Sequence, residues 1–192
     1  MHLQQKSEIN TSQSYTGIAK LLHWLMAGIW IAVWVVGVLA VYFRESLNPN
    51  HVLTFWHKAF GSVLFFLLVI RVVWRLANKP PGLPSHMTMT MRRAAYTGHI
   101  FLYLLALTLL PISGWIWSSV ADKPIMVLGL FQLPALLEPR PEAYGIAKWF
   151  HVICAWSSLA IVVGHVVVAF KHHLIDRDNV LLGMLPNFRK KR

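Results

Sequence analysis

Four long apolar segments, separated by short polar connections, dominate the chain. They run over residues 21–43, 52–73, 94–120 and 145–170. A helix rises 1.5 Å per residue, so about 20 residues cross the roughly 30 Å hydrocarbon layer of a bilayer. Because lipid offers no hydrogen-bond partners to the backbone, each segment is predicted to be a transmembrane helix. The first segment is much longer than the roughly 7–15-residue apolar core of a signal peptide, so we expect it to remain as an anchor.

The connections predict how these helices are arranged. Most are short, so neighbouring helices should pack antiparallel in one bundle. Residues 79–84 (KPPGLP) are typical of a stiff turn, and residues 121–144 form a long loop with four of the ten prolines. The predicted fold class is an all-α membrane protein: a four-transmembrane-helix bundle, one domain over residues 1–192, with polar tails at 1–18 and 184–192.

Composition supports a membrane protein and excludes other classes. The 192 residues are 56% hydrophobic and 13% charged, whereas a soluble domain is about 25% charged. The chain therefore has too little charge to cover a soluble globule, and too many aromatic and apolar residues for a disordered protein. Nine Trp residues suggest aromatic belts at the membrane interfaces. One cysteine, Cys154, excludes an intrachain disulfide and is expected to pack in the core.

The distribution of basic residues predicts the orientation. The chain has 18 Lys and Arg against 7 Asp and Glu. With the N-terminus in the cytoplasm, 13 of the 18 basic residues fall on the cytoplasmic side and 5 on the other, a positive-inside distribution. Both termini are then cytoplasmic. The tail Arg189–Arg192 is expected to bind the anionic leaflet rather than nucleic acid, because the other basic residues lie in gaps between apolar segments.

Histidine is the ionisable residue type that lies well inside the predicted spans. The seven carboxylates lie outside the spans or at their edges, so an intramembrane carboxylate relay has no obvious members. His23 and His165 lie near the cytoplasmic ends of the first and fourth spans, whereas His57 and His151 lie near the outer ends of the second and fourth. His151 and His165 are about 21 Å apart along one helix face. Ionisable residues at such depths usually face the bundle interior and carry function.

Two imidazoles from facing helices at matched depth can bind one haem iron. The sequence therefore predicts two haems, with axial pairs His23/His165 and His57/His151. Interhelical hydrogen bonding is the plain alternative for a single histidine. Zinc would need a third or fourth protein ligand, and a histidine-containing transporter without a cofactor is a further possibility. Small residues that could make room beside a porphyrin are Gly61, Gly98, Gly114 and Gly164.

Six histidines lie outside these pairs. His51, in the first outer loop, is a weaker alternative to His57. His99, near the cytoplasmic end of the third span, could replace His23 or His165 as a ligand. It could instead bond a haem propionate, a quinone carbonyl or a neighbouring helix. His172 and His173, at the cytoplasmic interface, are expected to be solvated.

Three basic residues lie close to the predicted ligands. Arg71 and Arg75 share one face at the cytoplasmic end of the second span, where they either extend to the lipid headgroups or pair with propionates of the inner haem. Lys58 follows His57 directly and could bind an outer propionate or attract an anionic electron donor.

Six stretches carry a resemblance to a known family. They are LLHWL (21–25), FWHKAFG (55–61), VIRVVWR (69–75), GHIFLYLLAL (98–107), PISGW (111–115) and VVGHVVVAFKHHLIDRDNVL (162–181). In this order, from about residue 15 to 186, the chain resembles the bacterial cytochrome b561 family, whose members include superoxide oxidases. Lys58 and the KPI segment at 123–125 differ from the superoxide-oxidising members.

The resemblance implies a four-helix bundle in the bacterial inner membrane with two haem b groups. Their ligands would be His23, His57, His151 and His165, and electrons would pass between an outer-face donor and ubiquinone. The donor would be a small anion such as superoxide or a periplasmic redox protein, and the chain would then be an oxidoreductase. The alternative is a haem b anchor subunit that passes electrons from a periplasmic dehydrogenase or hydrogenase to quinone.

Overall fold

The structure, a computed structural model, describes residues 14–85 and 87–186. Four helical spans account for most of the described chain: α2 (Gly17–Tyr42), α4 (Val52–Ala77), a composite third span over Met89–Val120, and α7 (Tyr144–Leu174). All four are long and apolar enough to cross a membrane. The predicted four-helix fold is therefore confirmed, and every span is longer than its apolar pattern suggested.

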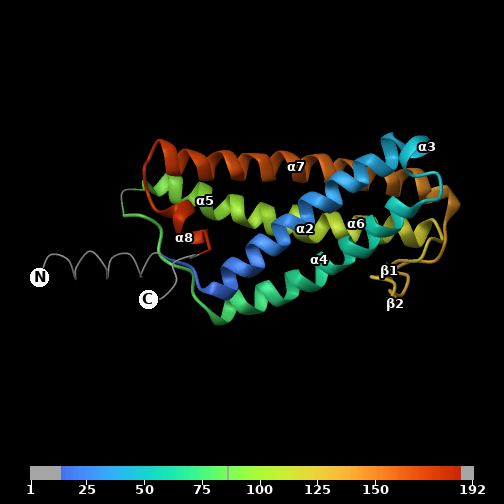
Figure 1. Cartoon of the computed structure of the whole chain (residues 1–192), viewed down its shortest axis with the longest axis horizontal. Helices are drawn as coiled ribbons and strands as arrows, with labels where there is room; N and C mark the ends of the chain where they lie inside the picture. Colours follow the sequence, from blue (N-terminus) through green and yellow to red (C-terminus); the bar gives the residue numbers. More distant parts are fainter. Residues whose placement is uncertain (1–13, 86, 187–192) are drawn as a thin grey trace, which may run out of the picture.

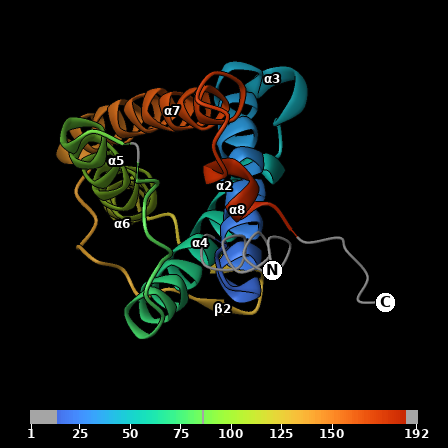
Figure 2. The ribbon, with the colours of Figure 1, turned by 90° about the vertical axis from the view of Figure 1, so that its left-hand side faces the viewer.

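The four spans form one elongated bundle (Figure 1). α2 packs along α4, and the third span packs along α7, which the end-on view shows as two neighbouring pairs (Figure 2). The pairs meet in an apolar cluster near the middle of the bundle, formed by Met26, Trp30, Leu64, Leu68 and Ala106. This core is small because much of the apolar surface faces outward, as lipid-facing helices require.

The third span contains a π-helical segment that the apolar pattern did not predict. It comprises α5 (Met89–Phe101), the π-helical η1 (Leu102–Leu109) and α6 (Leu110–Val120). Pro111 has no N–H, and its ring conflicts with the carbonyl four residues earlier in an α-helix. Wider i→i+5 turns precede it, and the Leu110 N–H donates to the carbonyl of Leu105.

Both ends of the described chain meet at one end of the bundle, called the inner end here. The backbone N–H of Tyr15 donates to the carbonyl of Gly183 at 3.1 Å. Trp24 Nε1 donates to the carbonyl of Met184 at 2.9 Å, so the short helix α8 (Val180–Met184) docks against the start of α2. The predicted anchor Arg189–Arg192 lies outside the described residues.

The expectation that His172 is solvated is wrong. Its side chain is buried at the end of α7, and Nδ1 lies 2.8 Å from an Asp178 carboxylate oxygen and 3.0 Å from one of Asp176. The chain reverses after α7 through Arg177, which has a positive φ of 52°, and this reversal brings both carboxylates to the imidazole. His173 remains partly exposed.

The opposite, outer end carries α3 (Arg44–Leu47) and the long loop. This loop contains a small antiparallel hairpin of β1 (Met126–Val127) and β2 (Phe131–Gln132), followed by the 3-10 turn η2 (Pro141–Ala143). The hairpin was not predicted, because its strands have only two residues each. It lies beside the outer part of α4.

Candidate functional site

The structure brings the predicted histidines together in the predicted pairs. His57 on α4 faces His151 on α7, with ring centres 6.2 Å apart and planes at 84°. His23 on α2 faces His165 on α7, with ring centres 6.3 Å apart and planes at 66°. One pair lies toward each end of the bundle, and α7 contributes one member to both.

The spacing of each pair fits a metal ion held between two imidazoles. A metal–nitrogen bond takes about 2 Å, and a ring adds roughly 1 Å from its nitrogen to its centre, so the ring centres should lie about 6 Å apart. Both pairs have this separation. If the two rings of a pair were only in van der Waals contact or shared a direct hydrogen bond, nothing would require the two pairs to have the same separation.

Hydrogen bonds orient both rings of the outer pair. His57 Nδ1 lies 2.8 Å from the carbonyl oxygen of Val33. A carbonyl only accepts, so Nδ1 carries the proton and Nε2 keeps its lone pair. The Ser113 hydroxyl donates to the carbonyl of Leu110 at 2.7 Å, and therefore accepts from His151 Nδ1 at 2.9 Å. Both imidazoles thus have Nε2 free to bind a metal, with the second nitrogen fixed as metal-binding histidines usually have it.

Two glycines make room for the outer rings. A Cβ at Gly37 would come within 2.7 Å of His57 Cε1, and one at Gly114 within 3.0 Å of His151 Cε1. Gly114 was among the predicted small residues, but Gly37 was not. Gly98 and Gly164 have nothing within 4 Å of an added Cβ, so these two predicted positions border open space rather than a histidine.

The inner pair has different neighbours. Arg71 Nη2 lies 3.3 Å from His23 Nδ1, and Arg71 Nε donates to the Tyr103 hydroxyl at 2.8 Å. His99 also lies beside His165, with ring centres 5.7 Å apart, and its Nδ1 donates to the carbonyl of Ala95 at 2.7 Å. The inner site therefore contains three histidines, of which the His23/His165 pair matches the outer pair in spacing.

Comparison with known proteins identifies the family of the chain. The family described as prokaryotic cytochrome b561 matches residues 14–187. The chain belongs to this family. It is 40% identical over 177 residues to cytochrome b561 homolog 2 of Escherichia coli (strain K12), covering 92% of this chain and 93% of that protein. It is 25% identical to a probable superoxide oxidase CybB of Yersinia pestis, over 88% and 93% of the two chains. Cytochrome b561 homolog 1 of Escherichia coli is 24% identical, over 86% and 93%.

Membership of the cytochrome b561 family makes the protein a multi-pass membrane protein that binds haem b and transfers electrons. Three buried side-chain polar atoms lack a hydrogen-bond partner in the described part of the chain: Arg71 Nη1, Trp117 Nε1 and Ser158 Oγ. Arg71 contacts His23, and the Trp117 ring lies 5.7 Å from that of His151. A buried donor without a partner is costly, and haem propionates would supply acceptors at both places. The residues present therefore fit the cofactor of the cytochrome b561 family.

Sequence reasoning missed Trp117, which was assigned to the aromatic belts with the other tryptophans. Its position near the outer end of the third span was the only indication that it could lie beside His151. No spacing rule distinguishes a tryptophan beside a ligand from one that faces lipid. Ser158 was also missed, although it lies seven residues from both His151 and His165 on one face of α7.

In this cytochrome b561 family member, Lys58 is hydrogen-bonded to the outer loop. Its Nζ donates to the backbone carbonyls of Lys123 at 3.1 Å and Pro124 at 2.9 Å. The lysine thus ties the loop to α4 next to His57. Its ammonium lies at the outer end of the bundle, where the sequence placed it.

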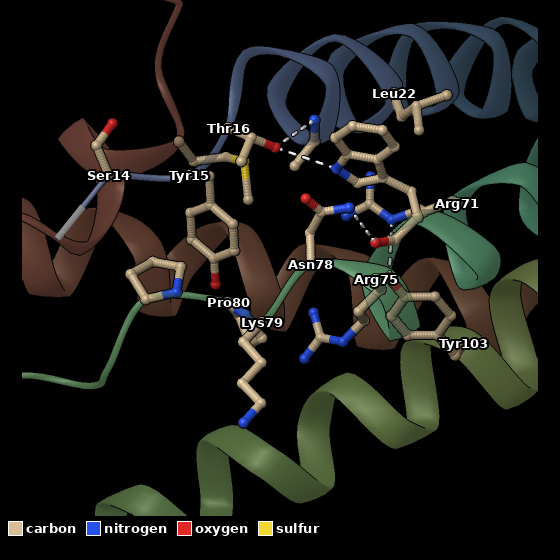
Figure 3. Close-up of a pocket in the computed structure, with 14 residues that line it drawn as sticks. Ser14, Tyr15, Thr16, Leu22, Arg71, Arg75, Asn78, Lys79, Pro80 and Tyr103 are labelled. Atoms are coloured by element: carbon tan, nitrogen blue, oxygen red, sulfur yellow. Dashed lines mark hydrogen bonds between the residues drawn. The ribbon is translucent and has the colours of Figure 1, made fainter. Parts of the chain in front are cut away.

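A pocket of about 170 Å³ opens at the inner end, between the start of α2 and the end of α4 (Figure 3). Arg71, Arg75 and Lys79 line it, together with Trp74 and Tyr15, and the described lining residues include no carboxylate. Burial raises the pKa of the Tyr15 hydroxyl, and the nearby arginines only partly offset this effect. The pocket therefore combines aromatic surface, cations and a protonated hydroxyl.

Proposed function

We propose that the protein is a di-haem cytochrome b that carries electrons across the bacterial inner membrane, from a donor at the outer end to ubiquinone. The observation that supports it is the presence of two histidine pairs of equal spacing, one toward each end of the bundle. His57 and His151 would bind the outer haem, and His23 and His165 the inner haem. Each haem, when bound, supplies a one-electron couple at its iron.

The surrounding residues position these groups. α7 is one uninterrupted helix and contributes a ligand to each site, which fixes the distance between the sites. Arg71 and Trp117 are the proposed propionate donors, because each has a buried N–H without a partner in the described chain. The inner end is assigned to the cytoplasm on the distribution of basic residues.

The inner pocket is the proposed site of the ubiquinone headgroup. Trp74 and Tyr15 offer aromatic surface and a protonated hydroxyl, while Arg75 and Asn78 offer N–H donors. Arg71 lines the same pocket and contacts His23 at 3.3 Å, so the pocket adjoins the inner site. Full reduction of one quinone to quinol requires two electrons, in successive single transfers, and two protons. The pocket can receive the protons from the inner face.

Filling this pocket should block reoxidation without disturbing haem binding. Ala19 lines the pocket, and we expect Ala19→Phe to slow reoxidation of the reduced protein by a ubiquinone analogue at least tenfold. Stopped-flow visible spectroscopy measures the rate, and the haem content per chain should remain two. Ile18→Phe, at a neighbouring position outside the pocket, is the matched control. An unchanged rate in Ala19→Phe would show that the quinone does not bind in this pocket.

The proposed donor is a small anion, with superoxide as the first candidate. Replacing Lys58 by Glu should slow superoxide-driven haem reduction several-fold, because the change reverses the charge beside the outer site. Lys148→Glu makes the same change in net charge elsewhere at the outer end and serves as the control. Equal slowing in both variants would indicate the general field of the outer face, and an unchanged rate in Lys58→Glu would exclude the role of Lys58.

The alternative function is an anchor subunit that receives electrons from a periplasmic dehydrogenase or hydrogenase. One observation favours it: the hairpin tip at the outer end exposes Leu130 and Phe131, at 78% and 50% of their surface. Such a tip could contact a protein partner. Co-purification of a periplasmic catalytic subunit, together with failure of the isolated cytochrome to oxidise superoxide, would favour this function over the first.

A further inference from the structure

The two histidine pairs differ in the groups that face their second ring nitrogens. In the outer pair, both Nδ1 atoms donate to oxygen acceptors: His57 to Val33 and His151 to Ser113. In the inner pair, Nη2 of the Arg71 guanidinium lies 3.3 Å from His23 Nδ1. When His23 binds an iron through Nε2, Nδ1 carries the ring proton and cannot accept a hydrogen bond, so Arg71 acts on this site through its positive charge. For this difference to affect electron transfer, each pair must bind a haem iron, as the proposed function requires.

An acceptor at Nδ1 strengthens an imidazole as an electron donor to a metal. A stronger donor stabilises the oxidised, more positive iron and thereby lowers the reduction potential. Both outer rings have such an acceptor, and Ser113 is fully buried, so water does not compete for its hydroxyl.

A cation near the iron has the opposite effect. Positive charge in a partly buried site disfavours the more positive oxidised state and raises the reduction potential. Arg71 places its positive charge beside His23. Arg75 and Lys79 line the same pocket as Arg71. At the outer pair, the nearest comparable side chain in the sequence is Lys58, whose ammonium is bound to two loop carbonyls.

The structure assigns to Arg71 the role of a positioning residue that sets a difference in potential between the two sites. The inner site has the higher potential and the outer site the lower, so electrons pass downhill from the outer end to the inner end. The direction of transfer is thus set by the acceptors bound to the outer ligands and by the positive charge beside the inner ones, independently of the identity of the donor.

A redox titration of the purified full-length protein tests this assignment, with the visible spectrum of haem b as readout. We expect two one-electron steps in the unmodified protein. Arg71→Gln should move the higher step down by enough to change the electron equilibrium between the sites at least tenfold, or about 59 mV for one electron. Arg75→Gln is the matched control, because both guanidinium carbons lie 5.8 Å from the centre of the Tyr103 ring while Arg71 contacts His23. The control should move the same step by less than half as much.

Ser113→Ala tests the other half of the assignment, and it does not depend on whether Arg71→Gln folds. It removes the acceptor at His151 and should raise the lower step, leaving the higher step in place. The proposal is overturned if Arg71→Gln moves the lower step or neither step, or if Ser113→Ala leaves the lower step unchanged. The same samples give the haem content per chain. Two haems with unmoved steps would contradict this inference alone, whereas one haem or none in the unmodified protein would contradict the proposed function.

Discussion

Replacing His151 by alanine should halve the haem b content, from two per chain to one, and leave the remaining haem low-spin. The imidazole of His151 is fixed by Ser113 and faces His57 at 6.2 Å, so its removal leaves the outer site with a single ligand. The pyridine haemochrome assay gives the haem per chain, and the oxidised-minus-reduced visible spectrum gives the spin state. His57→Ala should produce the same loss, and the double variant should lose no more than either single variant.

His173→Ala is the control for this experiment, since His173 lies on α7 beyond both pairs and is partly exposed. It should retain two haems. The inner site offers a sharper comparison, because His165 has both His23 and His99 within 6.3 Å between ring centres. We expect His23→Ala to lose the inner haem and His99→Ala to retain it. The reverse result would make His99 the ligand and return His23 to a packing role.

A single added methyl group at Gly37 should also cost the protein its outer haem. A Cβ at this position would lie 2.7 Å from His57 Cε1 and 2.8 Å from Nδ1, closer than nonbonded atoms approach. The ring must move, and it then loses its hydrogen bond to Val33 and its alignment with His151. We expect the haem content of Gly37→Ala to fall from two toward one per chain.

Gly28→Ala provides a matched control on the same helix, because nothing lies within 4 Å of a Cβ there. Alanine is favoured over glycine in a helix by about 1 kcal/mol, so this variant should keep both haems and melt at the same temperature or higher. If Gly37→Ala also retains two haems with an unchanged spectrum, the ring of His57 does not occupy the position described.

The fold and the histidine pairs could be predicted from sequence for a simple physical reason. The bilayer fixes the length and apolar character of each span, and depth along a span then decides which side chains can meet. His151 and His165 lie on one helix, so their separation follows from the helical rise alone. Matching them with His57 and His23 required only that neighbouring spans run antiparallel.

The contacts that could not be predicted depend on the rotation of each helix about its axis and on the positions of the ends of long side chains. The contact of Gly37 with His57 needs the crossing geometry of α2 and α4, and the contact of Arg71 with His23 joins residues 48 apart. Neither leaves a periodic signal in the sequence. His172 was misjudged because its burial comes from the chain reversal after α7, not from α7 itself.

The π-helical segment η1 has a consequence for chain length. Its i→i+5 turns take in more residues than α-helical turns would, so in terms of sequence length the segment acts as an insertion. If these eight residues formed a regular α-helix instead, each would turn the chain by about 100°, more than in the wider π-helical turns, and α6 would be rotated relative to α5. Ser113 and Gly114 would then turn away from His151, while His99 would keep its place beside His165. The outer site therefore depends on the helix type of a segment that contributes no ligand to it.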